Sequence, residues 1–235
     1  MRIINYGANG RLGKEISNLI ERGYKGASLA AEIDRNNTTS EETLQYRELN
    51  DFKGEADCII DFSNHAMTED LTSYAVRRNI PLIIATTGQN EEEREMIREA
   101  SKKIPVFFAA NMSLGIAVLK EIVKTAVKMM SEDAHIGIIE KHHDKKYDAP
   151  SGTAIFLANQ IKEVKPEEDV EIHSIRIGNL VGEHEISIGT SSETITLGHR
   201  AHSKVLFAEG AIRAAEFLVD KPAGLYNMDD IINNH

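Results

Sequence analysis

The sequence predicts an α/β protein of two domains, in which a parallel-sheet domain is followed by an α+β domain with a mixed, open sheet. Three observations lead to this prediction. Apolar strands alternate with amphipathic helices over residues 1–112, and alternating, β-rich segments dominate residues 113–204. In addition, 41% of the 235 residues are hydrophobic, which is enough to build a substantial core.

The first domain is predicted from strands and helices that alternate along the chain. Residues 2–7 form an apolar strand, residues 12–23 have apolar positions near the helical period, and residues 27–34 return as a strand. These segments make one βαβ unit. The same pattern continues, with strands expected at 56–63, 81–88 and 104–113 and helices at 68–79 and 90–103. Such apolar strands between amphipathic helices predict a parallel sheet covered on both faces.

The second domain begins with a strongly periodic helix at 114–130. Segments that alternate apolar and polar residues follow, with one helix among them, and the chain ends in a helix and a tail. The β-type segments are expected at 135–143, 170–189 and 193–203, the helices at 151–164 and 207–221, and the tail at 224–234. No long linker separates the two halves, so we expect a short hinge.

Charge and cysteine content narrow the possible functions. The chain has 27 Lys and Arg against 37 Asp and Glu, and a surface with a net charge of -10 repels nucleic acid and anionic lipid. The single cysteine, Cys58, lies in an apolar run, which indicates a buried thiol in a reducing compartment. No segment approaches the ~20 apolar residues of a membrane-spanning helix. We therefore expect a cytoplasmic protein without nucleic-acid or membrane partners, whose anion sites are locally positive.

The glycine-rich segment GANGRLG, residues 7–13, follows the first strand and opens the first helix. In that position glycines let a dinucleotide phosphate approach the backbone and its free N–H groups. Asp34 ends the second strand, where its carboxylate could accept hydrogen bonds from the adenosine ribose. Arg35 could contact a 2′-phosphate or stack on adenine, so both NADH and NADPH stay candidates. A turn that only needs positive φ is the alternative explanation of the glycines.

Two further strand ends carry small and polar residues. They are ATTGQN at 85–90 and AANMSLG at 109–115, and both fall where the carboxyl edge of the sheet should face a nicotinamide. Ordinary turn and capping chemistry is the alternative, with Asn111 or Ser113 starting the next helix.

The segment EKHHDKKYDAPSGTA, residues 140–154, concentrates positive charge beside small residues. A metal site is not favoured, because His142 and His143 point to opposite faces of a strand and no third ligand stands at a zinc spacing. A nucleophilic role for Ser151 is not favoured either, since the residues around it lack the G-x-S-x-G pattern.

The same segment predicts an anion site. Its PSGT portion favours a helix N-terminus, where Gly152 and Thr153 offer N–H groups and a hydroxyl to a carboxylate or phosphate. Lys146 lies near other cations, which favours loss of its proton, and histidine titrates near neutral pH. These side chains could act as general acids beside the bound anion. A solvated basic run is the alternative.

Together these motifs resemble the dihydrodipicolinate reductase family of the diaminopimelate route to lysine. The resemblance spans nearly the whole chain, and the sequence His-His-x-x-Lys followed by Asp-Ala-Pro-Ser-Gly-Thr is a specific signature. The matching segments, in the family's order, are GANGRLG, DFS at 61–63, ATTG, AANMSLG, EKHHDKKYDAPSGTA, HSIRIGNLVGEHE, GHRAHSK and FAEGAIRAAEFL.

The resemblance implies an oxidoreductase that transfers a hydride from NADH or NADPH to a cyclic dicarboxylate, 4-hydroxy-tetrahydrodipicolinate, with loss of water. It implies His142 as proton donor or acceptor and Lys146 as proton donor, while His143, Gly152 and Thr153 hold the substrate. It assigns the cofactor to Gly7, Ala8, Asn9, Gly10, Arg11, Leu12, Asp34, Arg35, Ala85, Thr86, Thr87, Ala109, Ala110, Asn111 and Met112.

The resemblance also implies the roles of the two domains. Residues 1–112, completed by residues 205–235, would form a dinucleotide-binding Rossmann-like domain. Residues 113–204 would bind the substrate and build a homotetramer through their open sheet.

The sequence departs from the family's pattern in places. Ala85 stands where glycine is usual, and the segment between Asp34 and Cys58 is short, which leaves the cofactor preference open. Lys145 is expected to be dispensable, unlike Lys146. Two other functions compete with the reductase, namely a different nicotinamide oxidoreductase for another small carboxylate and a dinucleotide-sensing regulator without chemistry of its own.

Overall fold

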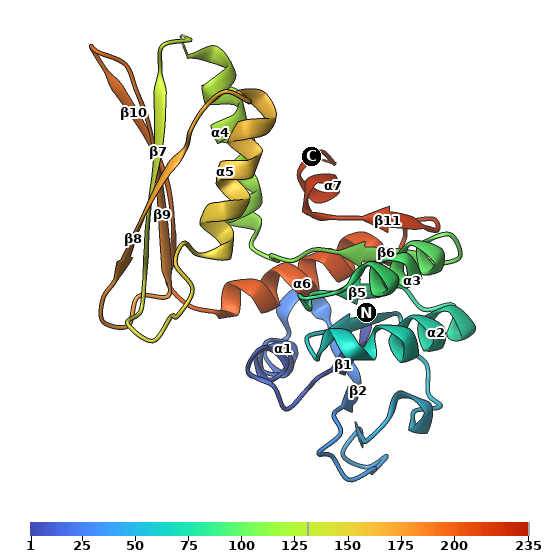
Figure 1. Cartoon of the computed structure of the whole chain (residues 1–235). Helices are drawn as coiled ribbons and strands as arrows, with labels where there is room; N and C mark the ends of the chain where they lie inside the picture. The colour runs from blue at the N-terminus through green and yellow to red at the C-terminus, as the bar shows by residue number, and fades with distance from the viewer. Residues whose placement is uncertain (131, 235) are drawn as a thin grey trace. The chain divides into compact units, whose positions relative to one another are not determined.

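The computed structural model describes residues 1–130 and 132–234, and the chain divides into two compact units (Figure 1). The first unit comprises Met1–Met112 and Val205–His235, and the second comprises Ser113–Lys204. Residue 131, inside the predicted second domain, and residue 235, at the end of the predicted returning segment, lie outside the described residues.

The first unit alternates strands and helices as its apolar periodicity predicts. Its strands are β1 (Arg2–Tyr6), β2 (Ser28–Ile33), β3 (Gln45–Tyr46), β4 (Cys58–Asp61), β5 (Leu82–Ile84), β6 (Pro105–Phe108) and β11 (Gly224–Tyr226). Its α-helices are α1 (Arg11–Glu21), α2 (Thr68–Arg78), α3 (Glu91–Ser101), α6 (Val205–Leu218) and α7 (Met228–Ile232).

The strands of this unit form one parallel sheet in the order β11-β6-β5-β4-β1-β2-β3. This is the Rossmann strand order with β11 added at one edge, which confirms the predicted fold class. The order reverses between β1 and β4, and sheets of this kind bind ligands outside the carboxyl ends of the strands at such a reversal. The tail was not predicted to supply a strand.

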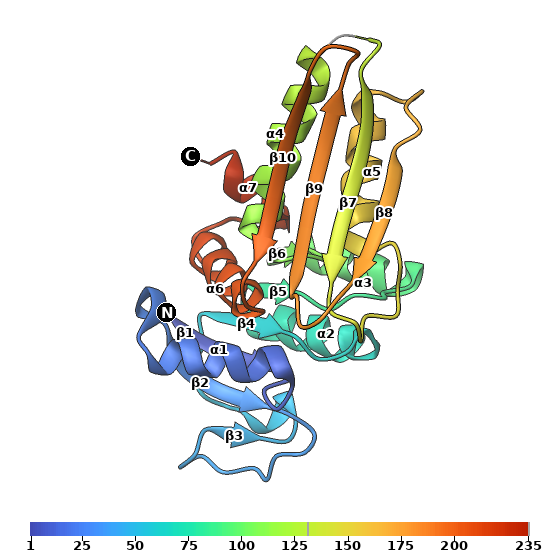
Figure 2. The ribbon, with the colours of Figure 1, turned by 90° about the vertical axis from the view of Figure 1, so that its left-hand side faces the viewer.

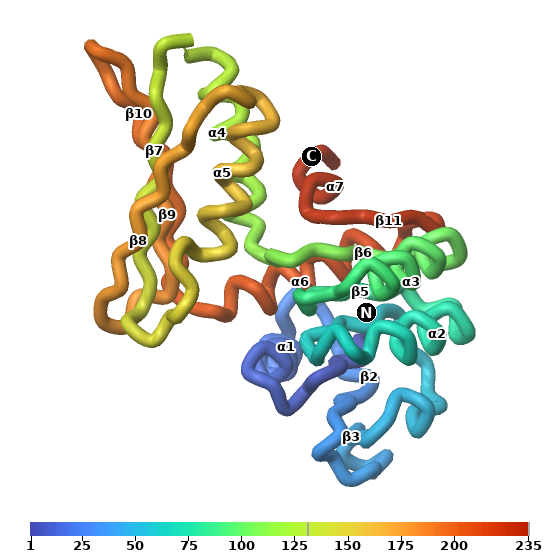
Figure 3. The backbone as a smooth tube through the Cα atoms, in the orientation of Figure 1, coloured from blue at the N-terminus to red at the C-terminus, as the bar shows by residue number. Residues whose placement is uncertain are grey.

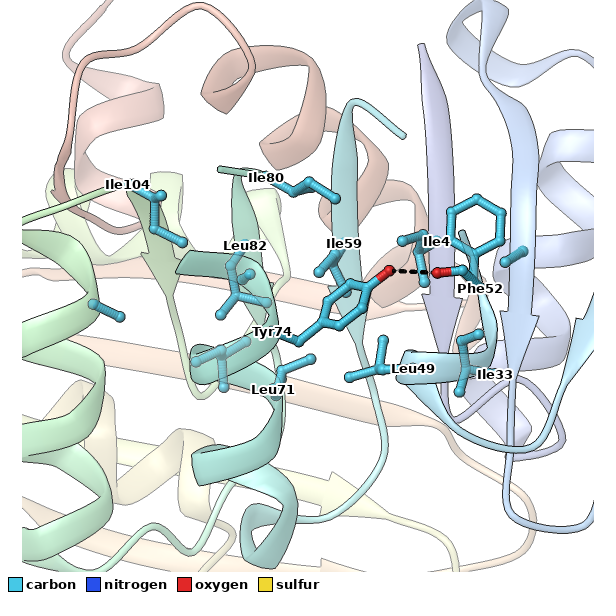
Figure 4. Packing of buried hydrophobic residues seen from close by; sticks show 14 of the residues in the cluster. Ile4, Ile33, Leu49, Phe52, Ile59, Leu71, Tyr74, Ile80, Leu82 and Ile104 are labelled. Atoms are coloured by element: carbon cyan, nitrogen blue, oxygen red, sulfur yellow. Dashed lines mark hydrogen bonds between the residues drawn. The ribbon is translucent and has the colours of Figure 1, made fainter. Parts of the chain in front are cut away.

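The core of the first unit explains why its strands are apolar runs. Ile4, Ile59 and Leu82 are fully buried between the helical layers (Figure 4). The Tyr74 hydroxyl donates a hydrogen bond of 3.2 Å to the Phe52 carbonyl oxygen, which ties α2 to the chain before β4 (Figure 4).

The returning helix α6 packs closely because its contact face is made of small residues. A Cβ at Gly210 would lie 1.8 Å from the Met112 carbonyl oxygen, so only glycine fits there. Ala208, Ala211 and Ala215 are fully buried. This contact holds the segment that follows β6 in place.

The second unit packs two helices on one face of a four-stranded sheet (Figure 2). Its elements are α4 (Leu114–Met129), β7 (His135–His142), α5 (Gly152–Val164), β8 (Glu171–Arg176), β9 (Gly182–Gly189) and β10 (Thr194–Ala201). The strand order is β10-β9-β7-β8, with β7 and β8 parallel and the other pairs antiparallel, so the predicted mixed sheet is confirmed. The chain leaves β7, crosses a loop and enters α5 (Figure 3).

Candidate active site

The turn between β1 and α1 packs closely against the segment after β4. Gly7 has a φ of +85°, and a Cβ on it would lie 2.9 Å from the Ser63 backbone, so glycine is required there. The N-cap of α1 is Gly10, without a side-chain cap and without an acidic residue in the first turn. Because the first N–H groups of a helix have no internal partners, this end of α1 attracts an anion.

The N-terminus of α3, in the same unit, differs from that of α1 because it has a side-chain cap and acidic residues. Asn90 caps this helix, and three glutamates occupy its first turn. These carboxylates already complement the helix dipole, so α3 has no positive end to offer to a phosphate.

A cavity of about 950 Å³ lies beside the open turn, within the size range of small-molecule sites. Asp34 reaches it from the end of β2. Its carboxylate accepts hydrogen bonds from the Asn9 N–H at 3.2 Å and from the Asn36 backbone and side-chain nitrogens at 3.0 Å each. Arg35 and Arg47 also line the cavity, as do the acidic residues Glu48 and Asp70. The cavity therefore combines an acceptor for hydroxyl groups with side chains of both charges.

The structure places the other predicted cofactor residues around this cavity or along the sheet edge. Gly7, Asn9, Gly10, Asp34 and Arg35 line the cavity. Ala8 is buried, and Arg11 and Leu12 begin α1 without lining it. The remaining predicted residues follow the neighbouring strands β5 and β6 and do not line the cavity either: Ala85, Thr86, Thr87, Ala109, Ala110, Asn111 and Met112.

A buried carboxylate that the sequence did not single out shapes this edge. Asp61, at the end of β4, accepts hydrogen bonds from the Ser63 N–H at 2.8 Å, the Ser63 hydroxyl at 2.5 Å and the Thr86 hydroxyl at 3.2 Å. Burial raises the pKa of Asp61 to about 6, against the lowering effect of these bonds. Since Ser63 lies against Gly7, Asp61 connects the glycine turn to the segment after β5.

A second group of candidate site residues lies at one end of the mixed sheet. Glu140 on β7 is fully buried, and its Oε2 lies 2.5 Å from His142 Nδ1. Arg176, the last residue of β8, binds both carboxylate oxygens, with Nη1 2.9 Å from Oε2 and Nη2 2.7 Å from Oε1. The Ser151 N–H donates to Oε1 at 3.1 Å. One carboxylate thus joins two strands and the N-cap of α5.

Burial and hydrogen bonding set the charges in this group. Burial by itself would raise the pKa of Glu140, but hydrogen bonds from Arg176, Ser174 and His142 outweigh it and hold that pKa at about 2. Burial lowers the pKa of His142, although the bond to Glu140 opposes the change. At neutral pH Glu140 is therefore an anion and His142 is neutral.

A second buried histidine, His184 on β9, lies beside His142. The two ring centroids are 5.2 Å apart in an edge-to-face arrangement. His184 Nε2 lies 3.1 Å from the Ser151 hydroxyl, which also accepts a hydrogen bond from the Ala154 N–H as the cap of α5. Burial lowers the pKa of His184 to about 4, so this ring is also neutral at pH 7.

The first turn of α5 forms the predicted helix N-terminus. Ser151 caps it, its first turn has no acidic residue, and Gly152 has open space where a Cβ would stand. Gly152 and Thr153 are its first two residues. This end of α5 can therefore receive a carboxylate.

The loop before α5 differs from the expectation in one respect. The sequence placed Lys146 among cations, but the structure pairs its Nζ with both carboxylate oxygens of Asp148, each at 2.7 Å. Arg176 Nη2 donates to the Asp148 carbonyl oxygen at 2.6 Å, which fixes the loop. His143 is half-buried, and its Nδ1 has no hydrogen-bond partner among the described residues.

Sequence reasoning missed the residues that organise this site. Glu140 stands two positions before His142, so strand alternation could have placed both on one face. Arg176 and His184 lie in the matching segment HSIRIGNLVGEHE, but no local pattern indicated that they lie near Glu140, because strand pairing brings them there. Glu140 is paired in register with Ser174 on β8 and His184 on β9.

Two kinds of site are absent from residues 1–130 and 132–234. No group of three or more His, Cys, Asp or Glu side chains there could hold a metal ion. No helix of this part of the chain has the length and apolar character needed to cross a bilayer.

Comparisons with known proteins match both halves of the chain. The family model for the N-terminus of dihydrodipicolinate reductase matches residues 1–112, and the model for its C-terminus matches residues 115–232. The 4-hydroxy-tetrahydrodipicolinate reductase of Caldanaerobacter subterraneus subsp. tengcongensis is 41% identical and covers 99% of this chain and 98% of its own. The Staphylococcus aureus reductase of the same name is 38% identical, and the match covers 97% of this chain and 98% of that protein.

A solved structure shares the fold. Dipicolinate-bound dihydrodipicolinate reductase from a Paenisporosarcina species superposes with a TM-score of 0.84 and 23% identity, over 98% of this chain and 99% of that one. Its similarity extends over both units. With family models on both halves and full-length relatives well above 30% identity, the chain belongs to the dihydrodipicolinate reductase family of oxidoreductases.

Proposed function

We propose that this chain reduces 4-hydroxy-tetrahydrodipicolinate to tetrahydrodipicolinate with NAD(P)H and a proton, with loss of the 4-hydroxyl group as water, in the diaminopimelate route to lysine. The observation that carries the proposal is the buried cluster of Glu140, His142 and Arg176 at the N-terminus of α5, in a chain that also has a Rossmann-type unit. Full-length relatives at 32–41% identity bear the name of this enzyme.

The first unit suits the cofactor. Its glycine turn and the uncapped start of α1 match the needs of a pyrophosphate, and Asp34 matches those of a ribose. When bound, the nicotinamide supplies the hydride. We assign the cofactor to the glycine turn, the end of β2 and the ends of β5 and β6, namely Gly7–Leu12, Asp34, Arg35, Ala85–Thr87 and Ala109–Met112.

The second unit suits a cyclic dicarboxylate. One carboxylate would bind at Gly152 and Thr153, where helix N–H groups and the dipole favour an anion. His143 would hold the other end of the substrate. Hydride addition leaves negative charge on the ring, and Lys146 would quench it by donating a proton while His142 accepts a hydrogen bond. The dipicolinate that the Paenisporosarcina structure contains is consistent with such a substrate.

The test follows NAD(P)H absorbance with substrate made in situ from pyruvate and aspartate semialdehyde by the preceding synthase. We expect oxidation of at least one of the two cofactors, and no oxidation of either would refute the proposal. A panel of other small carboxylates tests the competing oxidoreductase. Calorimetry that detects cofactor binding without turnover on any acid would instead favour a regulatory protein.

We also propose a homotetramer that assembles through the open face of the mixed sheet. Two helices cover one face, while the opposite face carries side chains such as Ile139 and Ile175, and Ile175 is 42% exposed. Light scattering should give four times the mass of one chain, and Ile175→Glu should lower it. A monomer in the wild type at micromolar concentration would contradict this assembly. The lone buried thiol of Cys58 further supports a cytoplasmic location.

A further inference from the structure

Glu140 is fully buried, and the proposed reaction gives it no direct contact with the substrate. It nevertheless contacts the two parts of the site that the reaction needs. Its Oε2 meets His142 Nδ1 at 2.5 Å, and its Oε1 accepts the Ser151 N–H at 3.1 Å. Glu140 therefore contacts both the histidine and the N-cap of the helix that would receive the carboxylate.

The contact with Glu140 determines which nitrogen of His142 carries the proton. An ionised carboxylate only accepts hydrogen bonds, so the Nδ1 atom must be protonated. In a neutral imidazole the Nε2 atom is then an acceptor. Nε2 faces Gly182, where a Cβ would lie 3.0 Å away, and it has no hydrogen-bond partner within the described part of the chain.

Arg176 determines whether His142 becomes charged. A lone carboxylate beside a histidine favours the imidazolium form. Here Arg176 binds the same carboxylate through two hydrogen bonds, so Glu140 and Arg176 together carry almost no net charge. The charged or titratable groups that face His142 are Glu140 on its own strand, Lys146 on the loop, Arg176 on β8 and His184 on β9. Burial lowers the pKa of His142, Glu140 opposes this change, and Lys146 and Arg176 lower the pKa further.

We propose that Glu140 and Arg176 are positioning residues for His142. Glu140 holds the ring proton on Nδ1, and Arg176 offsets the carboxylate charge so that the ring stays neutral and presents Nε2 as an acceptor toward the substrate. This inference rests on the proposed function, because it assigns His142 a part in the same reaction. It leaves Lys146 as the proton donor.

The ring tautomer can be measured without any enzyme activity. In the full chain labelled with 15N-histidine, two-bond proton–nitrogen spectra at pH 7 distinguish Nδ1–H from Nε2–H, and the His142 signal is the one lost in His142→Asn. We expect Nδ1–H in the wild type. A wild-type ring protonated on Nε2 would overturn the proposal.

Glu140→Gln tests the tautomer by reversing the contact. Oε1 accepts from two groups that can only donate, Arg176 Nη2 and the Ser151 N–H, so the amide oxygen should stay there. The new amide nitrogen then replaces Oε2 beside His142 Nδ1, with loss of the Arg176 Nη1 bond to that position. The ring proton should then move to Nε2. We expect kcat to fall by about 10²- to 10⁴-fold, as when a histidine is held in the wrong tautomer, with KM for NAD(P)H unchanged. An unchanged tautomer and unchanged kcat would refute the role of Glu140.

Arg176→Gln tests whether the guanidinium keeps His142 uncharged. Without the guanidinium, the Glu140–His142 pair should take up a proton at a pH about one unit higher, and the pH profile of kcat/KM should shift with it. Arg176→Lys keeps the charge and should stay closer to the wild type. Equal titration of His142 in the wild type and both variants would refute the role of Arg176.

A matched control comes from the same unit. Glu163→Gln removes the 2.9 Å ion pair with Lys124 between α4 and α5 and should change neither the tautomer nor the pH profile. If Glu140→Gln does not fold, the wild-type spectra still test the tautomer of His142, and the two Arg176 variants still test its titration. An inactive wild type with Nδ1–H and the predicted Arg176 shifts would refute the proposed function but support the positioning roles.

Discussion

The two units each contain a helix N-terminus proposed to bind a ligand, and these two helix ends differ in structure. α1 starts at Gly10 with no side-chain cap, and the backbone of Gly7 lies against Ser63. α5 starts at Ser151, whose hydroxyl caps the helix and whose N–H and side chain contact Glu140 and His184. The first end consists of backbone, and the second is embedded in buried, titratable side chains.

This difference indicates a division of labour. Backbone N–H groups bind an anion without a change in protonation, which suits a cofactor that is held and released. The shifted pKa values keep the buried Glu140 ionised and the buried His142 and His184 neutral at pH 7, which suits a site that orients groups for proton transfer. Binding and proton chemistry should therefore be lost separately by substitutions in the two units.

The largest effect is expected at Lys146. Lys146→Ala should lower kcat by about 10²- to 10⁴-fold, because it removes the proposed proton donor, and should leave the Kd for NAD(P)H nearly unchanged. Steady-state kinetics and a fluorescence titration of NADH measure the two quantities. Lys145→Ala is the matched control, since this neighbour is exposed and should be dispensable. Full activity of Lys146→Ala would disprove the proton-donor role.

The next effect concerns cofactor binding through Gly7. Gly7→Ala places a Cβ 2.9 Å from the Ser63 backbone at a φ of +85°, and the turn must shift to relieve the contact. We expect the Kd for NAD(P)H to rise about 10- to 100-fold and the free energy of unfolding to fall by about 1–3 kcal/mol. Fluorescence titration measures the Kd, and urea unfolding measures the free energy of unfolding.

Gly23→Ala provides the control for this substitution. Gly23 also has a positive φ, +74°, but no atom lies within 4 Å of the added Cβ. It should lower stability through backbone strain alone, with no change in cofactor affinity. Equal cofactor affinities in the two variants would exclude Gly7 from the binding turn.

Acid should affect the two units in opposite directions. The pKa of His184 is lowered from 6.5 to about 4, so as pH falls through this window the unfolded chain gains a proton before the folded one, and stability drops by up to about 3 kcal/mol. The pKa of Asp61 is raised from 3.8 to about 6, so the folded state binds the proton more tightly and regains stability as pH falls toward 4.

Urea midpoints between pH 7.5 and 4.5 measure these slopes. His184→Gln should flatten the loss of stability on acidification, whereas Asp61→Asn should make it steeper. Identical slopes in the wild type and both variants would show that neither group titrates as described.

The sequence predicted the parts of the fold that depend on local pattern. The alternation of strands and helices in the first unit and the mixed sheet of the second follow from apolar periodicity. Two strands were missed, because β3 and β11 have only two and three residues and show no period. Their places in the sheet come from tertiary pairing.

The site was only partly predictable for the same reason. His142, Lys146 and Gly152 stand in one short segment, so their proximity could be anticipated. Arg176 reaches Glu140 because β8 pairs with β7 in a particular register, which no local pattern specifies. The pairing of Lys146 with Asp148 depends on side-chain direction in a loop, which spacing does not set.

The smallest effect is expected at Gly182. A substitution there tests the position of the His142 ring separately from its tautomer. A Cβ at Gly182 would lie 3.0 Å from His142 Nε2, so Gly182→Ala should push the ring by a few tenths of an ångström while Glu140 still holds Nδ1. We expect kcat to fall about three- to tenfold, with the tautomer and the cofactor Kd unchanged. Gly137→Ala on β7, where the nearest atom is 4.0 Å from the added Cβ, is the control and should behave as wild type. If Gly182→Ala is as active as this control, the exact placement of the Nε2 atom does not limit the reaction, and the role of Glu140 reduces to the choice of tautomer.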